Sequence, residues 1–162
     1  MGVQKQQLTQ EQGLQKLRYY CGYQERSHYE VQQKLWELRI NKSYHDAIIS
    51  ALIEEDYLNE ERFAIHFAGG KFRMNEWGKK KIYYALKEKR VSDYCIQKAL
   101  KAIDEDDYER KLRELAEKKY NSLSRDQYLV RKKKTIDYLL QKGFETDLAN
   151  TVVNEIIKNE GL

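Results

Sequence analysis

The densest cationic stretch of the chain lies between residues 71 and 90, within which residues 75–90 read NEWGKKKIYYALKEKR. Eight basic residues stand there against two acidic ones, Glu76 and Glu88, which gives a local net charge of +6. Side-chain amines and guanidinium groups at this density attract phosphates and carboxylates. The eight basic residues are Lys71, Arg73, Lys79, Lys80, Lys81, Lys87, Lys89 and Arg90.

Two glycine–lysine pairs in and beside this stretch could in principle form a phosphate-binding loop. They are Gly69-Gly70-Lys71 and Gly78-Lys79. A P-loop needs a spaced second glycine, a Ser or Thr after its lysine, and a preceding strand, and neither pair has them. The favoured interpretation is close packing of a helix at a glycine.

The run after Gly78 divides into two faces if it is helical. At about 100° per residue, Gly78, Ile82 and Ala85 share one face. The opposite arc gathers a tyrosine among cationic side chains, namely Lys79, Lys80, Tyr83, Lys87 and Arg90. This division predicts a packing side and a contact side.

A second basic cluster, at residues 131–134, falls in the equivalent position of a later helix. A solvated helix face is the alternative for both clusters, but equivalent helices of a regular array tend to face the same way, which predicts one cationic stripe. Lysines supply point charges rather than base-reading forks, so contact with a nucleic acid should be independent of sequence. The candidates for partner and DNA binding are Lys71, Arg73, Lys79, Lys80, Lys81, Tyr83, Lys87, Arg90, Arg131, Lys132, Lys133 and Lys134.

Residues for catalysis or metal binding are poorly arranged. His28, His45 and His66 form no HxxxH or HxxE pair, and the acidic groups at 54–61 and 104–109 lack the spacing of a calcium loop. Cys21 and Cys95 are 74 positions apart with no CxxC, which indicates buried thiols rather than a disulfide framework. We expect no catalytic site, cofactor or metal.

Composition favours an ordered, thinly cored protein in the cytoplasm. The 162 residues are 41% hydrophobic and 35% charged, and the net charge of +4 leans toward anionic partners. No stretch approaches a membrane span or a secretory signal, so we expect neither membrane insertion nor secretion. We expect a monomer.

Capping residues predict nine helices, because proline is absent and glycine is scarce. Three capping boxes begin at Thr9, Ser27 and Ser43. The other predicted helix starts are Asn59, Asn75, Ser92, the acidic residues from Asp104, Ser124 and Thr146. Apolar residues within these runs recur at helical spacing, so the chain is predicted to be all-α.

An internal repeat organises these helices. Leu35 to Ile40, Leu86 to Val91, and Leu139 to Phe144 each precede a polar cap and an amphipathic run, at intervals of 51 and 53 residues. The chain is therefore predicted to be an elongated, curved array of three tandem three-helix repeats, with a flexible N-terminus at 1–8 and repeats at 9–57, 58–104 and 105–162. Predicted core residues are Trp36, Tyr57, Leu58, Phe63, Phe67, Ile82, Leu86 and Leu139.

Five segments, in order from about residue 14 to 157, resemble the RecX recombination regulators, which modulate the bacterial recombinase RecA. The segments are RSHYEVQQKL from Arg26, DYLNEERFA from Asp56, GKKKI from Gly78, LKEKRV from Leu86 and YLLQKGF from Tyr138.

The resemblance implies a non-catalytic protein lying in the groove of the RecA filament on single-stranded DNA. It implies lower ATP hydrolysis, strand exchange and induction of the DNA-damage response. The family pattern has glycine where this chain has Asp56 and Arg90, and aspartate in place of Asn59. The two replaced glycines imply a different helix exit at those positions.

Two points stay open at this level. Arg62 either pairs with neighbouring acids, which we favour, or touches the partner. The alternative function is a stand-alone, sequence-tolerant nucleic-acid-binding protein in which one three-helix unit docks like a helix-turn-helix.

Overall fold

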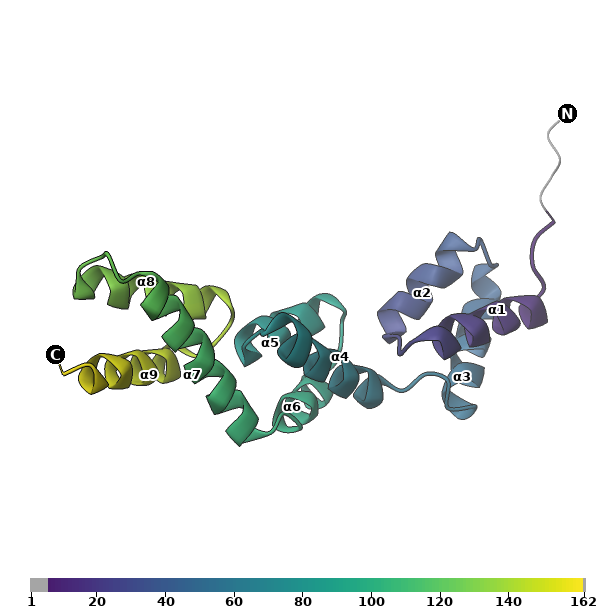
Figure 1. The fold of residues 1–162 in the computed structure, drawn as a ribbon. Helices are drawn as coiled ribbons and strands as arrows, with labels where there is room; N and C mark the ends of the chain where they lie inside the picture. The colour runs from purple at the N-terminus through teal and green to yellow at the C-terminus, as the bar shows by residue number, and fades with distance from the viewer. Residues whose placement is uncertain (1–5, 162) are drawn as a thin grey trace, which may run out of the picture.

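The computed structural model describes residues 6–161, which form nine α-helices and one short 3-10 turn and contain no strand. Unit one comprises α1 (Gln10–Tyr23), α2 (His28–Glu37), η1 (Lys42–Tyr44) and α3 (His45–Glu54). Unit two comprises α4 (Glu60–Asn75), α5 (Lys79–Glu88) and α6 (Asp93–Lys101). Unit three comprises α7 (Glu105–Ser122), α8 (Tyr128–Gln141) and α9 (Thr146–Asn159). Figure 1 shows the three units in a row, with α1 in the unit at one end and α9 in the unit at the other. The predicted all-α array is confirmed.

The exact unit boundaries stay predictions. The expected flexible N-terminus, residues 1–8, lies largely outside the described residues.

Helix starts follow the predicted caps at Thr9, Ser27, Asn59, Ser92 and Asp104, each of which accepts a hydrogen bond from an amide of the first turn. Thr9 and Gln12 form the full capping box.

Four residues predicted to be N-caps do not cap a helix, namely Ser43, Asn75, Ser124 and Thr146. Asn41 accepts the Ser43 amide at 3.0 Å and so starts η1, after which α3 begins at His45. Asn75 is the last residue of α4, Ser124 lies in the loop before α8, and Thr146 is already the first residue of α9.

The three predicted repeat signatures adopt the same local structure. The amides of Ile40, Val91 and Phe144 donate to the carbonyls of Leu35, Leu86 and Leu139, at 3.1 Å in each case, and all six side chains are buried. A 6→1 bond of this kind closes a helix through one left-handed residue.

Those left-handed residues are Arg39 (φ 56°), Arg90 (φ 59°) and Gly143 (φ 97°). Asp56 (φ 62°) ends α3 in the same way. The expectation of a different helix exit at Asp56 and Arg90 was therefore wrong. The exit is the usual left-handed one, adopted at the steric cost that a side chain brings there.

Buried side chains form two separate hydrophobic clusters. One lies within unit one and includes Leu17, Leu35 and Ile48, whereas the other runs without a break through units two and three. The core prediction holds for Leu58, Phe63, Ile82, Leu86 and Leu139, and Phe67 is partly buried against the larger cluster.

Trp36 and Tyr57 were wrongly assigned to the core, since they are 51% and 37% exposed. Trp36 covers the edge of the buried His45 ring from outside, at 4.8 Å between ring centroids. Tyr57 follows the left-handed Asp56 in the linker to unit two.

Candidate partner-binding surface

Helix α5 carries the cationic segment and is amphipathic as predicted. Ile82 and Leu86 are fully buried and Ala85 is half-buried, while Lys80 and Lys87 are exposed. Gly78 is the N-cap and is itself buried. The helix therefore presents one apolar side to the core and one lysine-bearing side to solvent.

Gly78 is a packing residue, as the glycine–lysine interpretation predicted. A Cβ at Gly78 would lie 2.3 Å from the carbonyl carbon of Gly143 and from the amide nitrogen of Phe144. The approach lets the Gly78 amide donate to the Lys142 carbonyl at 2.8 Å and the Lys80 amide donate to the Gly143 carbonyl at 2.9 Å. The first turn of α5 thus gives its free amides to unit three.

Gly69 is less tightly constrained than Gly78, because the atoms nearest to it belong to a flexible side chain rather than to the backbone. The Arg73 guanidinium lies 2.7 Å from where a Gly69 Cβ would be. Gly69 and Gly70 are interior residues of α4, so this pair forms no loop at all.

Several of the predicted contact residues are engaged within the protein. Lys79 lies 4.8 Å from the centre of the Tyr108 ring, and its amide donates to the Tyr108 hydroxyl at 3.0 Å. Lys71 and Lys81 flank the Trp77 ring at 4.9 and 4.7 Å. These lysines cover aromatic rings in addition to carrying charge.

The far end of α5 is engaged as well. Lys87 forms an ion pair with Asp93 at 3.0 Å, and this contact raises the pKa of Lys87 and lowers the pKa of Asp93. Tyr83 donates to the same carboxylate at 3.2 Å. Arg90 stacks on Tyr29 of unit one, with 4.4 Å from its guanidinium carbon to the ring centre. The predicted face is thus partly neutralised near Asp93.

Arg131, the first residue of the basic cluster at 131–134, is engaged within the protein. Arg131 donates two hydrogen bonds to the Tyr120 carbonyl, stacks 3.7 Å from the Tyr120 ring centre and has a side chain only 14% exposed. The Arg131 guanidinium therefore holds α8 against α7 and is not part of the accessible lysine surface.

The other three members remain accessible. Lys133 and Lys134 are exposed and pair with Asp137 at 2.7 Å and Asp126 at 2.9 Å, while Lys132 is half-buried. Residues 132–134 take the same places in unit three as residues 79–81 in unit two, at the 53-residue interval of the repeat.

One exposed tyrosine beside the lysines of α5 was not singled out in the sequence. Tyr84 is 66% exposed, meets Tyr83 edge-on at 5.4 Å, and with Lys79, Lys80 and Leu100 lines a shallow hollow of about 300 Å³. Its position next to predicted contact residues was the signal that could have found it. Tyr94 on α6, also 66% exposed, lies under the Lys98 amine, on the helix that follows those residues.

Several other polar residues singled out in the sequence make contacts within the protein. Buried His45 has its Nε2 2.9 Å from the Ile40 carbonyl oxygen, and Arg62 pairs with Glu25 and Asp56, which confirms the favoured interpretation of Arg62. Cys21 and Cys95 are free buried thiols, as predicted, and burial raises the pKa of Cys21 to about 11.

Within residues 6–161 the protein offers neither a metal-binding cluster of side chains nor a membrane-spanning helix. No group of three or more His, Cys, Asp or Glu side chains among these residues could hold a metal ion. No helix between residues 6 and 161 is long and apolar enough to cross a membrane.

Known proteins resemble the chain in both sequence and fold. The family models for the second and third three-helix domains of RecX match residues 59–100 and 105–153. A regulatory protein RecX from Clostridium perfringens is 34% identical over 134 residues, which cover 81% of this chain and 62% of that protein. One from Leuconostoc mesenteroides is 28% identical, over 79% of this chain and 48% of that protein. The chain thus matches about half to under two thirds of the length of these relatives.

Solved structures agree with these matches. The crystal structure of RecX from Lactobacillus salivarius superimposes with a TM-score of 0.83 and 31% identity, covering 90% of this chain and 95% of that one. A second crystal structure, of a regulatory protein RecX, shares the fold at a TM-score of 0.81 and 19% identity. The chain therefore belongs to the RecX family.

Proposed function

We propose that this protein is a non-catalytic regulator that binds the RecA filament on single-stranded DNA and restrains RecA. The expected consequences are lower RecA ATP hydrolysis, less strand exchange and weaker induction of the DNA-damage response. The observation that carries the proposal is membership of a family whose relatives are named regulatory proteins.

The proposed contact surface is a set of exposed and half-buried lysines on α5 and α8, together with two adjacent tyrosine rings of α5. It comprises Lys80, Lys132, Lys133, Lys134, Tyr83 and Tyr84, with Lys71, Arg73, Lys79, Lys81, Lys87 and Arg90 at its margin. Two lysine triplets at equivalent positions of an elongated array suit a long anionic partner such as a DNA backbone or an acidic filament groove. We expect a cytoplasmic monomer that needs no cofactor and whose DNA contacts are independent of sequence.

The test is RecA-dependent ATP hydrolysis on single-stranded DNA, measured while this protein is titrated in. The proposal predicts that hydrolysis falls with increasing protein and that the fall is weaker at high salt. Unchanged hydrolysis at several-fold excess, together with tight salt-dependent binding to DNA alone, would instead favour the stand-alone nucleic-acid-binding protein.

A further inference from the structure

Helix α1 carries a stripe of one lysine and three tyrosines, of which Tyr19 and Tyr23 are left in solvent. Lys16, Tyr19, Tyr20 and Tyr23 stand at i, i+3, i+4 and i+7, the spacing of a packed helix face. The core-facing stripe of α1 is a different one, made by Leu14, Leu17 and Cys21. Tyr19 and Tyr23 are 79% and 77% exposed. Unit one therefore displays two large rings side by side in solvent.

A groove of about 730 Å³ lies along this stripe and is lined from α1, the following loop and α2. Tyr20 forms part of its lining, with the Arg26 guanidinium carbon 3.7 Å and the Lys34 amine 5.4 Å from its ring centre. Arg26 is fixed there because its Nε also donates to the Tyr20 carbonyl at 3.1 Å. The groove thus has an ordered cationic and aromatic lining.

The charge of the lining favours an anionic occupant. The lining residues are Gln15, Lys16, Tyr19, Tyr20, Tyr23, Arg26, Lys34 and Leu38, three cations with no acid. Glu30 and Glu37 pair with Arg26 at 3.9 Å and Lys34 at 3.3 Å from outside the groove, whereas Lys16 is exposed. A basic groove with accessible aromatic rings is the usual platform for single-stranded nucleic acid.

The spacing of the rings favours one strand over a duplex. Tyr19 and Tyr23 are four residues apart on one helix, a rise of about 6 Å. Bases in a duplex follow one another at about 3.4 Å, so two rings this far apart suit an extended strand.

We propose that the groove of unit one binds unpaired nucleotides of a single strand, with bases stacked on Tyr19 and Tyr23 and phosphates held near Lys16 and Lys34. This site is separate from the lysines of α5 and α8. It rests on the proposed function only in that the regulator meets single-stranded DNA.

The test is fluorescence anisotropy of a labelled oligothymidylate with the full chain and no RecA. Tyr19→Ala/Tyr23→Ala should weaken binding by about tenfold for each ring, the loss expected for a stacked base. Tyr19→Phe/Tyr23→Phe should bind like the wild type, because phenylalanine keeps the ring. Tyr94→Ala, which removes an equally accessible ring beside a lysine of unit two, should have no comparable effect.

The salt dependence of binding distinguishes a loss of base stacking from a loss of charge. The alanine variant should keep the wild-type slope of log affinity against log salt, whereas Lys16→Ala should lower that slope by about one. Photocrosslinking of an oligonucleotide carrying iodouracil should map to Tyr19 or Tyr23. Crosslinks confined to α5 or α8 would overturn the proposal.

Unaltered oligothymidylate affinity in the alanine variant would also overturn the proposal that the groove binds a single strand. If that variant had also lost RecA regulation, the groove would instead be assigned to a protein partner. A wild-type protein that binds the oligonucleotide through these tyrosines yet leaves RecA hydrolysis unchanged would refute the proposed function and leave this site standing.

Discussion

The two junctions between units are built from different interactions. Units two and three share one hydrophobic cluster and exchange backbone hydrogen bonds at Gly78 and Lys80. Units one and two have separate clusters and meet through side-chain charges, with Arg62 to Glu25 at 2.6 Å and Lys89 to Glu30 at 3.5 Å. One junction excludes water from backbone and rings, and the other relies on partly exposed ion pairs.

Tyr108 connects unit three to unit two. Its ring lies between Phe72 at 5.7 Å and Phe144 at 5.3 Å, while its hydroxyl accepts from the Lys79 amide and donates to Glu145. Burial, with a further contribution from Glu145, raises the pKa of Tyr108. No comparable buried aromatic links unit one to unit two within residues 6–161.

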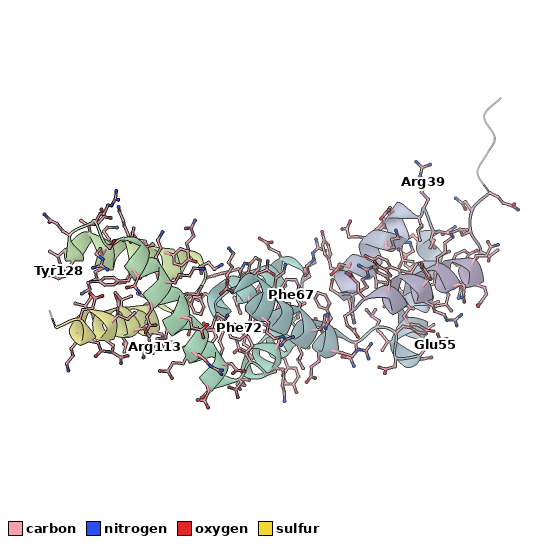
Figure 2. The ribbon with its side chains drawn as sticks, viewed as in Figure 1. Arg39, Glu55, Phe67, Phe72, Arg113 and Tyr128 are labelled. Atoms are coloured by element: carbon pink, nitrogen blue, oxygen red, sulfur yellow. The ribbon has the colours of Figure 1, made fainter. Side chains whose placement is uncertain are left out.

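Similar repeats are therefore joined in different ways within one chain. A fused core resists salt and unfolds as one body, whereas partly exposed ion pairs contribute little and are screened. We therefore expect units two and three to act as one rigid lysine-bearing platform, and unit one to change its orientation more readily. In Figure 2, Glu55 at the end of α3 in unit one lies apart from Phe67 and Phe72 of α4 in unit two.

Gly78→Ala should destabilise the protein more than any other substitution considered below. The added Cβ meets backbone atoms of Gly143 and Phe144 that cannot move aside without losing both hydrogen bonds between the units. We expect the free energy of unfolding to fall by about 3 kcal/mol, the upper end of overpacking costs, as measured by chemical denaturation. Gly70→Ala is the control: nothing lies within 4 Å of its Cβ, and it should be stabilising. Equal stability of the two variants would contradict the fused junction.

Tyr108→Phe should cost less, because the ring stays and only the hydroxyl is lost. Glu145 and the Lys79 amide lose their shared partner, at a cost of about 1–2 kcal/mol. Denaturation followed by circular dichroism measures the loss. A variant as stable as the wild type would show that the hydroxyl does not hold units two and three together.

Arg39→Gly tests whether the two clusters unfold separately. Arg39 is exposed and left-handed at φ 56°, so glycine should stabilise the exit of α2 by about 1 kcal/mol. If unit one unfolds on its own, only its transition should move to higher denaturant. A shift of one single transition for the whole chain would contradict two cooperative units.

The smallest energetic effect belongs to the ion pairs of the first junction. A double-mutant cycle of Arg62→Met and Glu25→Gln should give a coupling of about 1 kcal/mol or less. The geometric effect should be clearer. Spin labels at Gln33→Cys in unit one and Lys101→Cys in unit two should show a distance distribution that widens in molar salt.

Buried Cys21 and Cys95 should leave the introduced cysteines as the labelled ones. A matched pair of labels at Lys101→Cys and Lys158→Cys spans units two and three and should show no widening. Equal widening of both pairs would remove the difference between the junctions.

The sequence predicted the repeat because its signals are local. A cap such as Ser27 and a buried pair such as Leu35 and Ile40 act within a few residues of each other. The contacts that engage predicted surface residues within the protein depend on partners outside the local pattern. Lys79 is engaged by Tyr108, 29 residues away, and Arg131 by Tyr120 on the preceding helix. A helical wheel shows which way a lysine points but not which ring another unit brings to it.

The most direct test of the proposed surface is charge reversal at its accessible lysines. Lys80→Glu/Lys133→Glu/Lys134→Glu should keep the wild-type helicity and nearly the wild-type unfolding midpoint, because all three side chains are exposed. Lys101→Glu/Lys118→Glu/Lys158→Glu makes the same change in net charge at exposed sites outside the surface. In the RecA ATP-hydrolysis assay we expect the first variant to lose inhibition and the second to inhibit like the wild type. Full inhibition by the first variant would contradict the proposed surface.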